Sequence, residues 1–359
     1  MRRLLPLVVL ALAVAACGDD GTGPDGPSDD PDAPAPRTYA MGWAPSAPRP
    51  EEALFLDVID SLSRVSEATI IQQEVPWGPL LAGASMDSLV QDRKGLADFL
   101  RARGLEIVFL VDPLQGLDRT REARGLEEAG RSILEPEIRA MHEAWALAVA
   151  EAIRPEWMGL ASEINTLAAR GDPGLYAELR DMINDLAPRI RSASPGSRVF
   201  VSVQADEANG ALVDPIVDHF ALIDDFDIDA LGLSSYPVFA FDAPEDVPPD
   251  YLDPFAEATD LPLLMVEGGW SSADVPLASG TTAEQAAYFR RYEELLDRVE
   301  ARLWVGLTFT DLDVEALDLP PERARGLSNF ARMGILDVSL ERKPAYAEWE
   351  RIFQRPLEP

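Results

Sequence analysis

Short apolar runs alternate with longer amphipathic stretches along the chain from Thr38 onward. Each apolar run is almost continuously hydrophobic and rich in β-branched residues, a pattern typical of a strand buried on both faces. The stretches between the runs have helical spacing, as in "EEALFLDVIDSLSRV" and "EPEIRAMHEAWALAVAEAI". The segment "TTAEQ" adds a helix start signal, with a threonine before the first turn and an acidic residue within it. The eight apolar runs occupy residues 38–44, 68–75, 105–112, 156–163, 197–204, 228–236, 261–269 and 302–310.

This alternation predicts a parallel sheet whose outer face is covered by helices. Eight β/α units within residues 38–359 predict an α/β fold, a single (β/α)8 TIM barrel that forms one domain. A doubly wound open sheet is the alternative. It is less favoured because "MGWAPSAP", at the end of the first run, is not the G-x-G-x-x-G loop of dinucleotide-binding sheets.

The first 37 residues differ in composition from the rest of the chain. Two arginines precede the apolar stretch "LLPLVVLALAVAA", which suits the core of a secretory signal peptide. The stretch ends in "VAAC", which resembles the bacterial lipobox and implies a lipoprotein signal peptide at residues 1–16 and a lipidated Cys17. Residues 17–37 are mostly Gly, Pro, Asp and Ser, so we expect a disordered acidic tether there. An ordinary secreted protein with an incidental cysteine is the alternative.

The lipobox resemblance implies a bacterial cell-envelope protein that is held to a membrane by its N-terminal lipid. The outer membrane is favoured because Gly18 is not the aspartate that retains enteric lipoproteins at the inner membrane. Periplasmic and surface-facing positions both stay open. The chain has 63 acidic and 31 basic residues, a formal charge of −32. That charge repels nucleic acid, so no nucleic-acid partner is expected, and we expect a monomer.

The chain contains two histidines, His142 and His219. Both lie in predicted helices away from the strand ends, where we expect them to face solvent or to be structural. Metal-dependent barrel hydrolases need several histidines at the active-site ring, and a Ser-His-Asp hydrolase needs one there. The sequence therefore disfavours both classes, and no metal or other cofactor is expected.

Two glutamates end predicted strands that are not neighbours in the chain. Glu163 ends the fourth run, in "GLASEINT", and Glu267 ends the seventh, in "LMVEGGW". The carboxyl ends of barrel strands meet at the active-site face, so the two side chains can face each other. A pair of carboxylates about 5 Å apart supports retaining hydrolysis of a glycosidic bond. Taken alone, Glu163 has a second interpretation, a cap for the helix near Asn165.

Other residues at the predicted strand ends are candidates for substrate binding. Asp112, before Pro113, is a turn-former or a sugar ligand. Sugar rings offer apolar faces to flat aromatic side chains, and three tryptophans lie at the ring. Trp270 is favoured as a stacking platform. For Trp43 and for Trp77, stacking and core packing are about equally favoured.

Several short motifs resemble those of clan A glycoside hydrolases. "GLASEIN" and "LMVEGGW" look like the acid/base and nucleophile signatures of the clan. "IDALGLSSYP" and the "EIN" run are similar to segments of the endo-β-1,4-galactanase family, and "FARMGILDVSLERKPAYAEWERI" looks like the usual clan ending. The resemblance implies Glu163 as acid/base, Glu267 as nucleophile, Tyr236 as hydrogen-bond donor to the nucleophile, and Asn165 within the substrate-binding set.

Two departures from the clan pattern bear on activity. Ser162 occupies the position where the clan has an asparagine that binds the sugar 2-hydroxyl, and serine offers fewer donors. The clan arginine at the end of strand two is absent, since "IIQQEVPW" supplies Gln72, Gln73 and Glu74. We therefore expect a retaining hydrolase of a β-linked poly- or oligosaccharide, with a non-catalytic or impaired glycan-binding envelope lipoprotein as the alternative.

Overall fold

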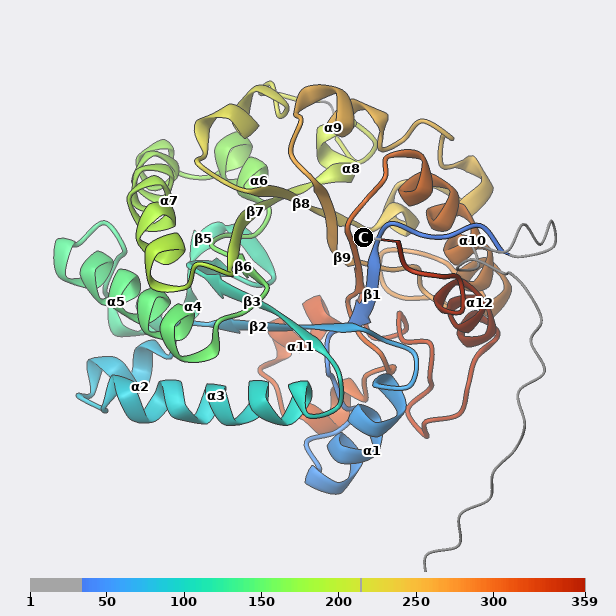
Figure 1. Cartoon of the computed structure of the whole chain (residues 1–359), viewed down its shortest axis with the longest axis horizontal. Helices are drawn as coiled ribbons and strands as arrows, with labels where there is room; N and C mark the ends of the chain where they lie inside the picture. The colour runs from blue at the N-terminus through green and yellow to red at the C-terminus, as the bar shows by residue number, and fades with distance from the viewer. Residues whose placement is uncertain (1–33, 214, 359) are drawn as a thin grey trace, which may run out of the picture. The chain divides into compact units, whose positions relative to one another are not determined.

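The computed structural model describes residues 34–213 and 215–358. Within them, eight parallel strands close into a barrel in the order β1-β10-β9-β8-β7-β6-β3-β2 (Figure 1). Each strand lies inside one of the eight apolar runs, so the prediction of a (β/α)8 TIM barrel is confirmed. The strands are β1 (Ala40–Trp43), β2 (Ala68–Glu74), β3 (Glu106–Asp112), β6 (Trp157–Gly159), β7 (Arg198–Gln204), β8 (Ala230–Ser235), β9 (Leu263–Gly268) and β10 (Leu303–Gly306).

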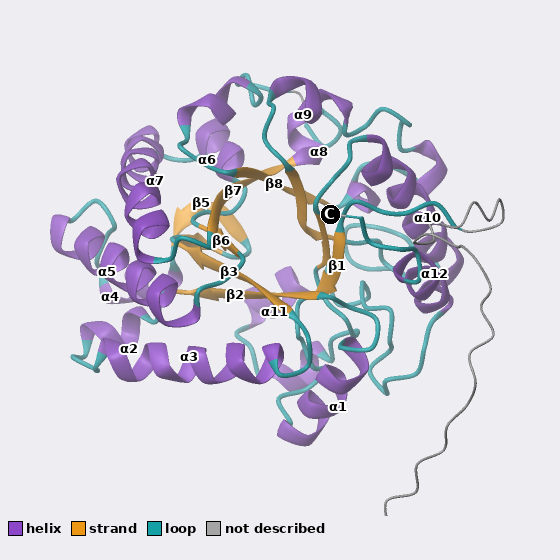
Figure 2. Cartoon of the chain, viewed as in Figure 1, coloured by secondary structure: helices purple, strands orange, loops and turns teal. Residues whose placement is uncertain are grey.

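Helices surround the barrel, as Figure 2 shows. Some of them begin at a side-chain cap: for α10 the Thr281 hydroxyl accepts from the Glu284 N–H at 3.2 Å, and for α7 Asp172 accepts from the Leu175 N–H at 2.9 Å. The α-helices are α1 (Glu52–Leu62), α2 (Trp77–Leu81), α3 (Met86–Arg101), α4 (Arg124–Ala129), α5 (Pro136–Ile153), α6 (Ile164–Arg170), α7 (Pro173–Ala193), α8 (Ala205–Ala208), α9 (Asp253–Ala258), α10 (Thr282–Arg298), α11 (Pro321–Ser328) and α12 (Pro344–Phe353). Short 3-10 turns are η1 (Ala221–Asp225), η2 (Pro237–Phe239), η3 (Pro244–Asp246) and η4 (Val314–Leu317).

Two hydrophobic clusters lie on the two sides of the barrel wall. Alternation along each strand separates them: Ile70 packs inside the barrel, and Ile71 packs outside against the helices. The interior is crowded at Gly159, where an added Cβ would lie 2.4 Å from Leu110 Cδ1 and 2.7 Å from Phe200 Cζ. The barrel is thus filled by side chains, and only its mouth is left for chemistry.

A two-stranded antiparallel hairpin interrupts the β/α alternation after β3. It consists of β4 (Leu114–Gln115) and β5 (Asp118–Glu122). The hydrophobic pattern of the sequence does not predict this hairpin. The hairpin lies at the carboxyl end of β3 and therefore belongs to the active-site face of the barrel.

The folded unit begins slightly before the predicted boundary at residue 38, with Pro36 as its first residue. Arg37, which the sequence analysis assigns to the tether, is 2% exposed. Its guanidinium donates to the Tyr39 carbonyl at 2.6 Å and pairs with Glu67, so it belongs to the barrel domain. The predicted signal peptide, Cys17 and the tether up to residue 33 lie outside the described residues. No helix of the described part is long and apolar enough to cross a membrane.

Candidate active site

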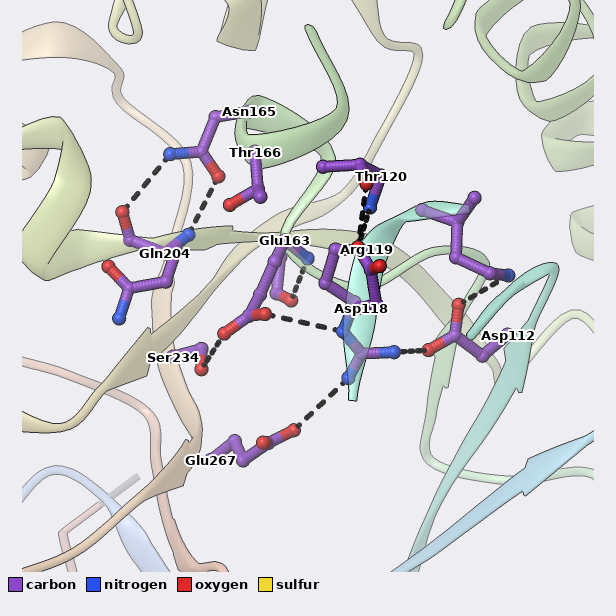
Figure 3. A network of polar contacts seen from close by, with 12 residues as sticks. Asp112, Asp118, Arg119, Thr120, Glu163, Asn165, Thr166, Gln204, Ser234 and Glu267 are labelled. Carbon is purple, nitrogen blue, oxygen red and sulfur yellow. Dashed lines mark hydrogen bonds and ion pairs between the residues drawn. The ribbon is translucent and has the colours of Figure 1, made fainter. Parts of the chain in front are cut away.

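The two glutamates singled out from the sequence meet at the mouth of the barrel. Glu163 follows β6, Glu267 lies on β9, and both line one cavity of about 320 Å³. The Arg119 guanidinium lies between them, with Nε 3.2 Å from Glu163 Oε2 and Nη2 3.8 Å from Glu267 Oε2 (Figure 3). Two carboxylates from distant chain segments therefore share one cation over one cavity.

A register irregularity directs Glu267 toward the mouth. Leu264 and Val266 pack inside the barrel and Met265 packs outside, so strict alternation would turn Glu267 toward the helices. The pairing of β8 with β9 shifts at this point, because Met265 pairs with Leu233 whereas Glu267 pairs with the next residue, Ser234. Such a bulge changes the direction of the side chains that follow it. Glu267 lines the cavity at the mouth as a result.

Backbone conformation places Glu163. Its φ of +48° is left-handed, which is uncommon for a residue other than glycine. Its N–H donates to Ser202 Oγ at 3.0 Å, and Ser234 Oγ donates to its Oε1 at 2.6 Å. Glu163 is the N-cap residue of α6, but its side chain forms no capping hydrogen bond. The helix-capping interpretation of this carboxylate is therefore wrong.

Two further donors hold Glu267. The Tyr236 hydroxyl donates to Oε1 at 2.5 Å, and Gln72 Nε2 donates to Oε2 at 3.2 Å. Tyr236 is itself fixed by Asp206, a buried carboxylate that accepts from the Tyr236 backbone N–H at 2.6 Å and from the Tyr251 hydroxyl at 2.6 Å. These contacts hold the Glu267 carboxylate at the cavity.

The missing strand-two arginine is replaced from elsewhere in the chain. Arg119 on the β4–β5 hairpin is 5% exposed and pairs with Asp112 at 2.5 Å, in addition to its contacts with the two glutamates. Asp112 also accepts from the Leu114 N–H at 3.1 Å. Asp112 therefore forms the turn and anchors Arg119, and its oxygens are already engaged within the protein. Strand two itself carries no arginine, as the sequence indicated, but the hairpin brings a guanidinium to the same site.

Burial and charge set the proton affinity of Glu163. Burial, with a smaller contribution from the charge of Glu267, raises the pKa of Glu163 to about 7, against the lowering effects of Arg119 and Ser234. Burial, and then the adjacent Glu267 carboxylate, raises the pKa of Tyr236, so its hydroxyl remains a donor. A carboxyl group with this pKa is poised to give and to take a proton near neutral pH.

The three tryptophans proposed as sugar platforms lie in the core instead. Trp43 is 1% exposed and packs on Trp349 with ring centroids 4.7 Å apart. Trp77, also 1% exposed, stacks on His142 at 6.1 Å. Trp270 is fully buried beside Tyr288. A buried ring cannot stack on a substrate, so all three assignments are corrected to core packing.

Asn165 and Ser162, the other predicted binding residues, do not line the cavity. Asn165 is buried and joins α6 to the end of β7, accepting from the Gln204 N–H at 2.8 Å and donating to the Gln204 carbonyl at 3.1 Å. Ser162 is 1% exposed. His142 and His219 are both buried rather than solvent-facing, and His219 Nδ1 contacts Asn165 Nδ2 at 3.0 Å.

Sequence reasoning missed residues that do line the site. Phe239 and Phe330 line the cavity beside Tyr236, with ring centroids 6.2 Å and 5.1 Å from the Tyr236 ring. Arg119 and Ser234 contact Glu163 directly. A signal for Arg119 was present in "LQGLDRTRE", where a Gly-containing turn separates two short polar strands. Among the described residues, no group of three or more His, Cys, Asp or Glu side chains is placed to hold a metal ion.

No protein-family model and no curated protein sequence matches the chain. Solved structures do match. An exo-beta-1,4-mannosidase from Opitutaceae bacterium strain TAV5 is 14% identical with a TM-score of 0.65, over 91% of this chain but only 60% of that chain's length. A GH5_18 variant from Bifidobacterium longum subsp. longum, in complex with Manb1-4GlcNAc, is 14% identical with a TM-score of 0.66, over 90% of this chain and 80% of that one. Xylanase 10B from Thermotoga maritima is 12% identical with a TM-score of 0.61, over 88% and 95%. At these identities the likeness shows a shared barrel fold.

Proposed function

We propose that the protein is a retaining glycoside hydrolase that acts on a β-linked poly- or oligosaccharide. One observation carries the proposal: Glu163 and Glu267, at the ends of β6 and β9, contact the same guanidinium and line the same cavity. Paired carboxylates at one sugar-sized cavity suit double displacement at an anomeric carbon. The glycosidases among the structural neighbours support the same class of reaction.

In both steps Glu163 transfers the proton, and Glu267 forms and then releases the bond to the sugar carbon. A Glu267 oxygen attacks the anomeric carbon, the glycosidic C–O bond breaks, and the proton of Glu163 passes to the leaving oxygen. Water then attacks the same carbon, Glu163 takes a proton from it, and the ester bond to Glu267 breaks. Glu163 ends protonated and Glu267 ends ionised, as both began.

The electrostatics support this division of roles. Tyr236 and Gln72 donate to the two oxygens of Glu267 and hold its carboxylate in place for attack. Burial holds the pKa of Glu163 at about 7, so a substantial fraction is protonated at neutral pH. Once Glu267 is esterified its charge disappears, the proton affinity of Glu163 falls, and the group becomes a base for the second step.

A glycan-binding protein without turnover is the second candidate, and one observation favours it. Both oxygens of Glu163 already accept hydrogen bonds, Oε1 from Ser234 and Oε2 from Arg119, and these donors favour the carboxylate over the acid. Ser162 in place of the clan asparagine points the same way. A barrel with these features would keep its sugar cavity and lose the proton donor.

Activity assays separate the two candidates. The purified protein is incubated with aryl β-glycosides and with galactan, mannan and glucan, and the anomer formed first is followed by NMR. Release of a β-anomer that disappears in both Glu163→Gln and Glu267→Gln supports the hydrolase. An α-anomer would contradict retention. Binding of a glycan with no product under any condition supports the second candidate.

The matched glutamate variants also test the two roles. Aryl leaving groups of low pKa depart without protonation, so Glu163→Gln should retain the first step on them and accumulate the glycosyl enzyme. Glu267→Gln should lose the first step on every substrate. Equal losses for both variants on an activated aryl glycoside would contradict the assignment.

We further propose that the protein is a lipid-anchored envelope protein, with Cys17 as the modified residue and the outer membrane as its location. The lipobox-like "VAAC" and the acidic tether composition support this. Membrane fractionation of cells grown with labelled palmitate tests it. Label and membrane association should both be lost in Cys17→Ser, and an unlabelled wild-type protein in the soluble fraction would overturn the proposal.

A further inference from the structure

A second, larger cavity extends from Glu267 away from Glu163. It measures about 830 Å³ and is lined from the ends of β1, β2 and β3 and from helices α1, α3 and α11. Glu267 lines both cavities, whereas Glu163 lines only the smaller one. In a retaining hydrolase the nucleophile lies beneath the glycone and the acid/base faces the leaving group. The larger cavity is therefore on the glycone side of the proposed reaction.

Two arginines without partners line this larger cavity. Arg93 comes from α3 and Arg323 from α11. Neither forms a hydrogen bond or ion pair with any residue of the described part of the chain, and Arg93 Nε is buried without an acceptor. A buried donor that lacks an acceptor is unfavourable, so it marks a place where a ligand oxygen would be stabilised.

The other charges of the cavity offset the charge of this pair only in part. Arg119 forms ion pairs with Asp112, Glu163 and Glu267. Glu74, at the end of β2, is the remaining carboxylate on the wall, and the charge of Arg323 lowers its pKa against the larger effect of burial. The wall thus carries two unpartnered guanidinium groups against one carboxylate, in a protein whose formal charge is −32. The buried Arg93 Nε without an acceptor, beside the exposed guanidinium of Arg323, indicates a place for an anionic ligand.

We propose that this cavity selects glycans that carry an acidic group on the glycone side of the scissile bond, with Arg93 and Arg323 as its ligands. The inference rests on the proposed function for its orientation. The planar fork of a guanidinium matches a carboxylate with two parallel hydrogen bonds. Apolar neighbours on the same wall, such as Phe55 and Leu96, exclude water and strengthen the pairing. A uronic acid carboxylate fits this chemistry, and a sulfate ester presents the same charge.

Matched ligands test the inference by binding and by hydrolysis. Pairs of β-linked oligosaccharides and aryl β-glycosides are used that differ only in a C6 hydroxymethyl or a C6 carboxylate, with C6-sulfated members as a third arm. Affinity is measured by calorimetry and kcat/KM by product release. We expect the carboxylate member to be preferred by about tenfold or more, the scale of a charge-assisted hydrogen bond. A preference for the sulfated arm alone would identify sulfate as the acidic group.

Variants on one helix supply the control. Arg323→Gln and Arg93→Gln should each reduce the ratio of acidic to neutral affinity about tenfold, and Arg93→Lys should restore part of it. Arg325 is exposed like Arg323 on the same helix α11, but it does not line the cavity and has no ion pair within residues 34–213 and 215–358. Arg325→Gln should leave the ratio unchanged.

The outcomes separate this inference from the proposed function. Acid-selective binding that depends on Arg93 and Arg323, without hydrolysis of any ligand, would support the inference and refute the hydrolase. Hydrolysis with equal binding of acidic and neutral members would support the hydrolase and overturn the inference. A preference that survives both Gln substitutions would also overturn it.

Discussion

Ser234→Ala perturbs one hydrogen bond to the carboxyl group on which the chemistry depends. Ser234 Oγ donates to Glu163 Oε1 at 2.6 Å, and that donor lowers the pKa of Glu163 against the larger effect of burial. Burial and the charge of Glu267 raise the pKa of Glu163, and without the Ser234 donor only Arg119 still lowers it. The pKa of Glu163 therefore rises from about 7. Because Glu163 must be protonated for the first step, kcat/KM falls as pH rises through this pKa, and the variant should keep its activity to higher pH.

The size of the effect follows from the hydrogen bond. A bond to a charged group contributes about 1.5–3 kcal/mol. Only part of this energy appears in the pKa of Glu163, because in the wild-type protein the Ser234 hydroxyl can also rotate and accept a hydrogen bond from the protonated acid. A net loss of about 1 kcal/mol moves the alkaline limb of kcat/KM upward by about 0.7 pH units, since one pH unit corresponds to about 1.4 kcal/mol.

A neighbouring serine provides the matched control. Ser202 is equally buried and contacts Glu163, but its hydroxyl accepts from the backbone N–H rather than donating to the carboxylate. Ser202→Ala should leave the alkaline limb in place. The pH profile is measured on an aryl glycoside, and the carboxyl titration is followed in parallel by NMR of ¹³C-labelled glutamate, with Glu163→Gln identifying the resonance. If the alkaline limb of kcat/KM and the pKa of Glu163 stay unchanged in Ser234→Ala, or move to lower pH, the reasoning is refuted.

Three further variants test the contacts around the site and the core. Tyr236→Phe removes a donor to Glu267 and should lower kcat about tenfold to a hundredfold with little change in the melting temperature; an unchanged kcat would contradict the role. Arg119→Gln leaves buried carboxylates without their cation and should lower the free energy of unfolding by about 3–5 kcal/mol at pH 8, and by less at pH 4, where Glu163 is protonated. Arg121→Gln, on the same hairpin but exposed, should change stability little, and denaturant titration compares the two. Trp43→Ala should lower the free energy of unfolding by about 3–5 kcal/mol; a stable variant with only weakened substrate binding would restore the stacking role.

The barrel itself was predictable from the sequence because its signal is repeated. Eight nearly continuous apolar runs separated by helical stretches admit few architectures, and each run contains one observed strand. The positions of Glu163 and Glu267 followed from that architecture, since a residue that ends a barrel strand lies at the active-site face. What remained hidden was the local geometry, the bulge beside Glu267 and the left-handed φ of Glu163.

The tryptophan assignments failed because proximity to a strand end does not decide the side of the wall. Met41 and Trp43 lie two residues apart on β1 and both pack outside the barrel, as does Tyr39 just before the strand, so the period of two already placed Trp43 on the same side as Met41. Trp77 and Trp270 lie beyond strand ends, where no period applies. Their burial is a result of tertiary packing that single-sequence reasoning does not reach.

Arg119 shows the other kind of failure. The expected arginine was sought on strand two, and the chain supplies the same charge from a hairpin inserted after β3. A charged side chain can reach the same site from several different positions in the chain. A departure from a linear motif therefore does not establish the loss of a chemical group.

The most direct test of the account is to trap the intermediate. Aryl 2-deoxy-2-fluoro-β-glycosides slow both steps, because fluorine at C2 destabilises the oxocarbenium-like transition state, and a good leaving group lets the first step proceed. Neutral and uronic members are incubated with the protein, which is then digested and analysed by peptide mass spectrometry. We expect one glycosyl adduct, on Glu267, that is absent from Glu267→Gln. An adduct on another residue would contradict the assignment, and turnover of the parent glycoside with no adduct from any member would contradict a covalent mechanism at this site.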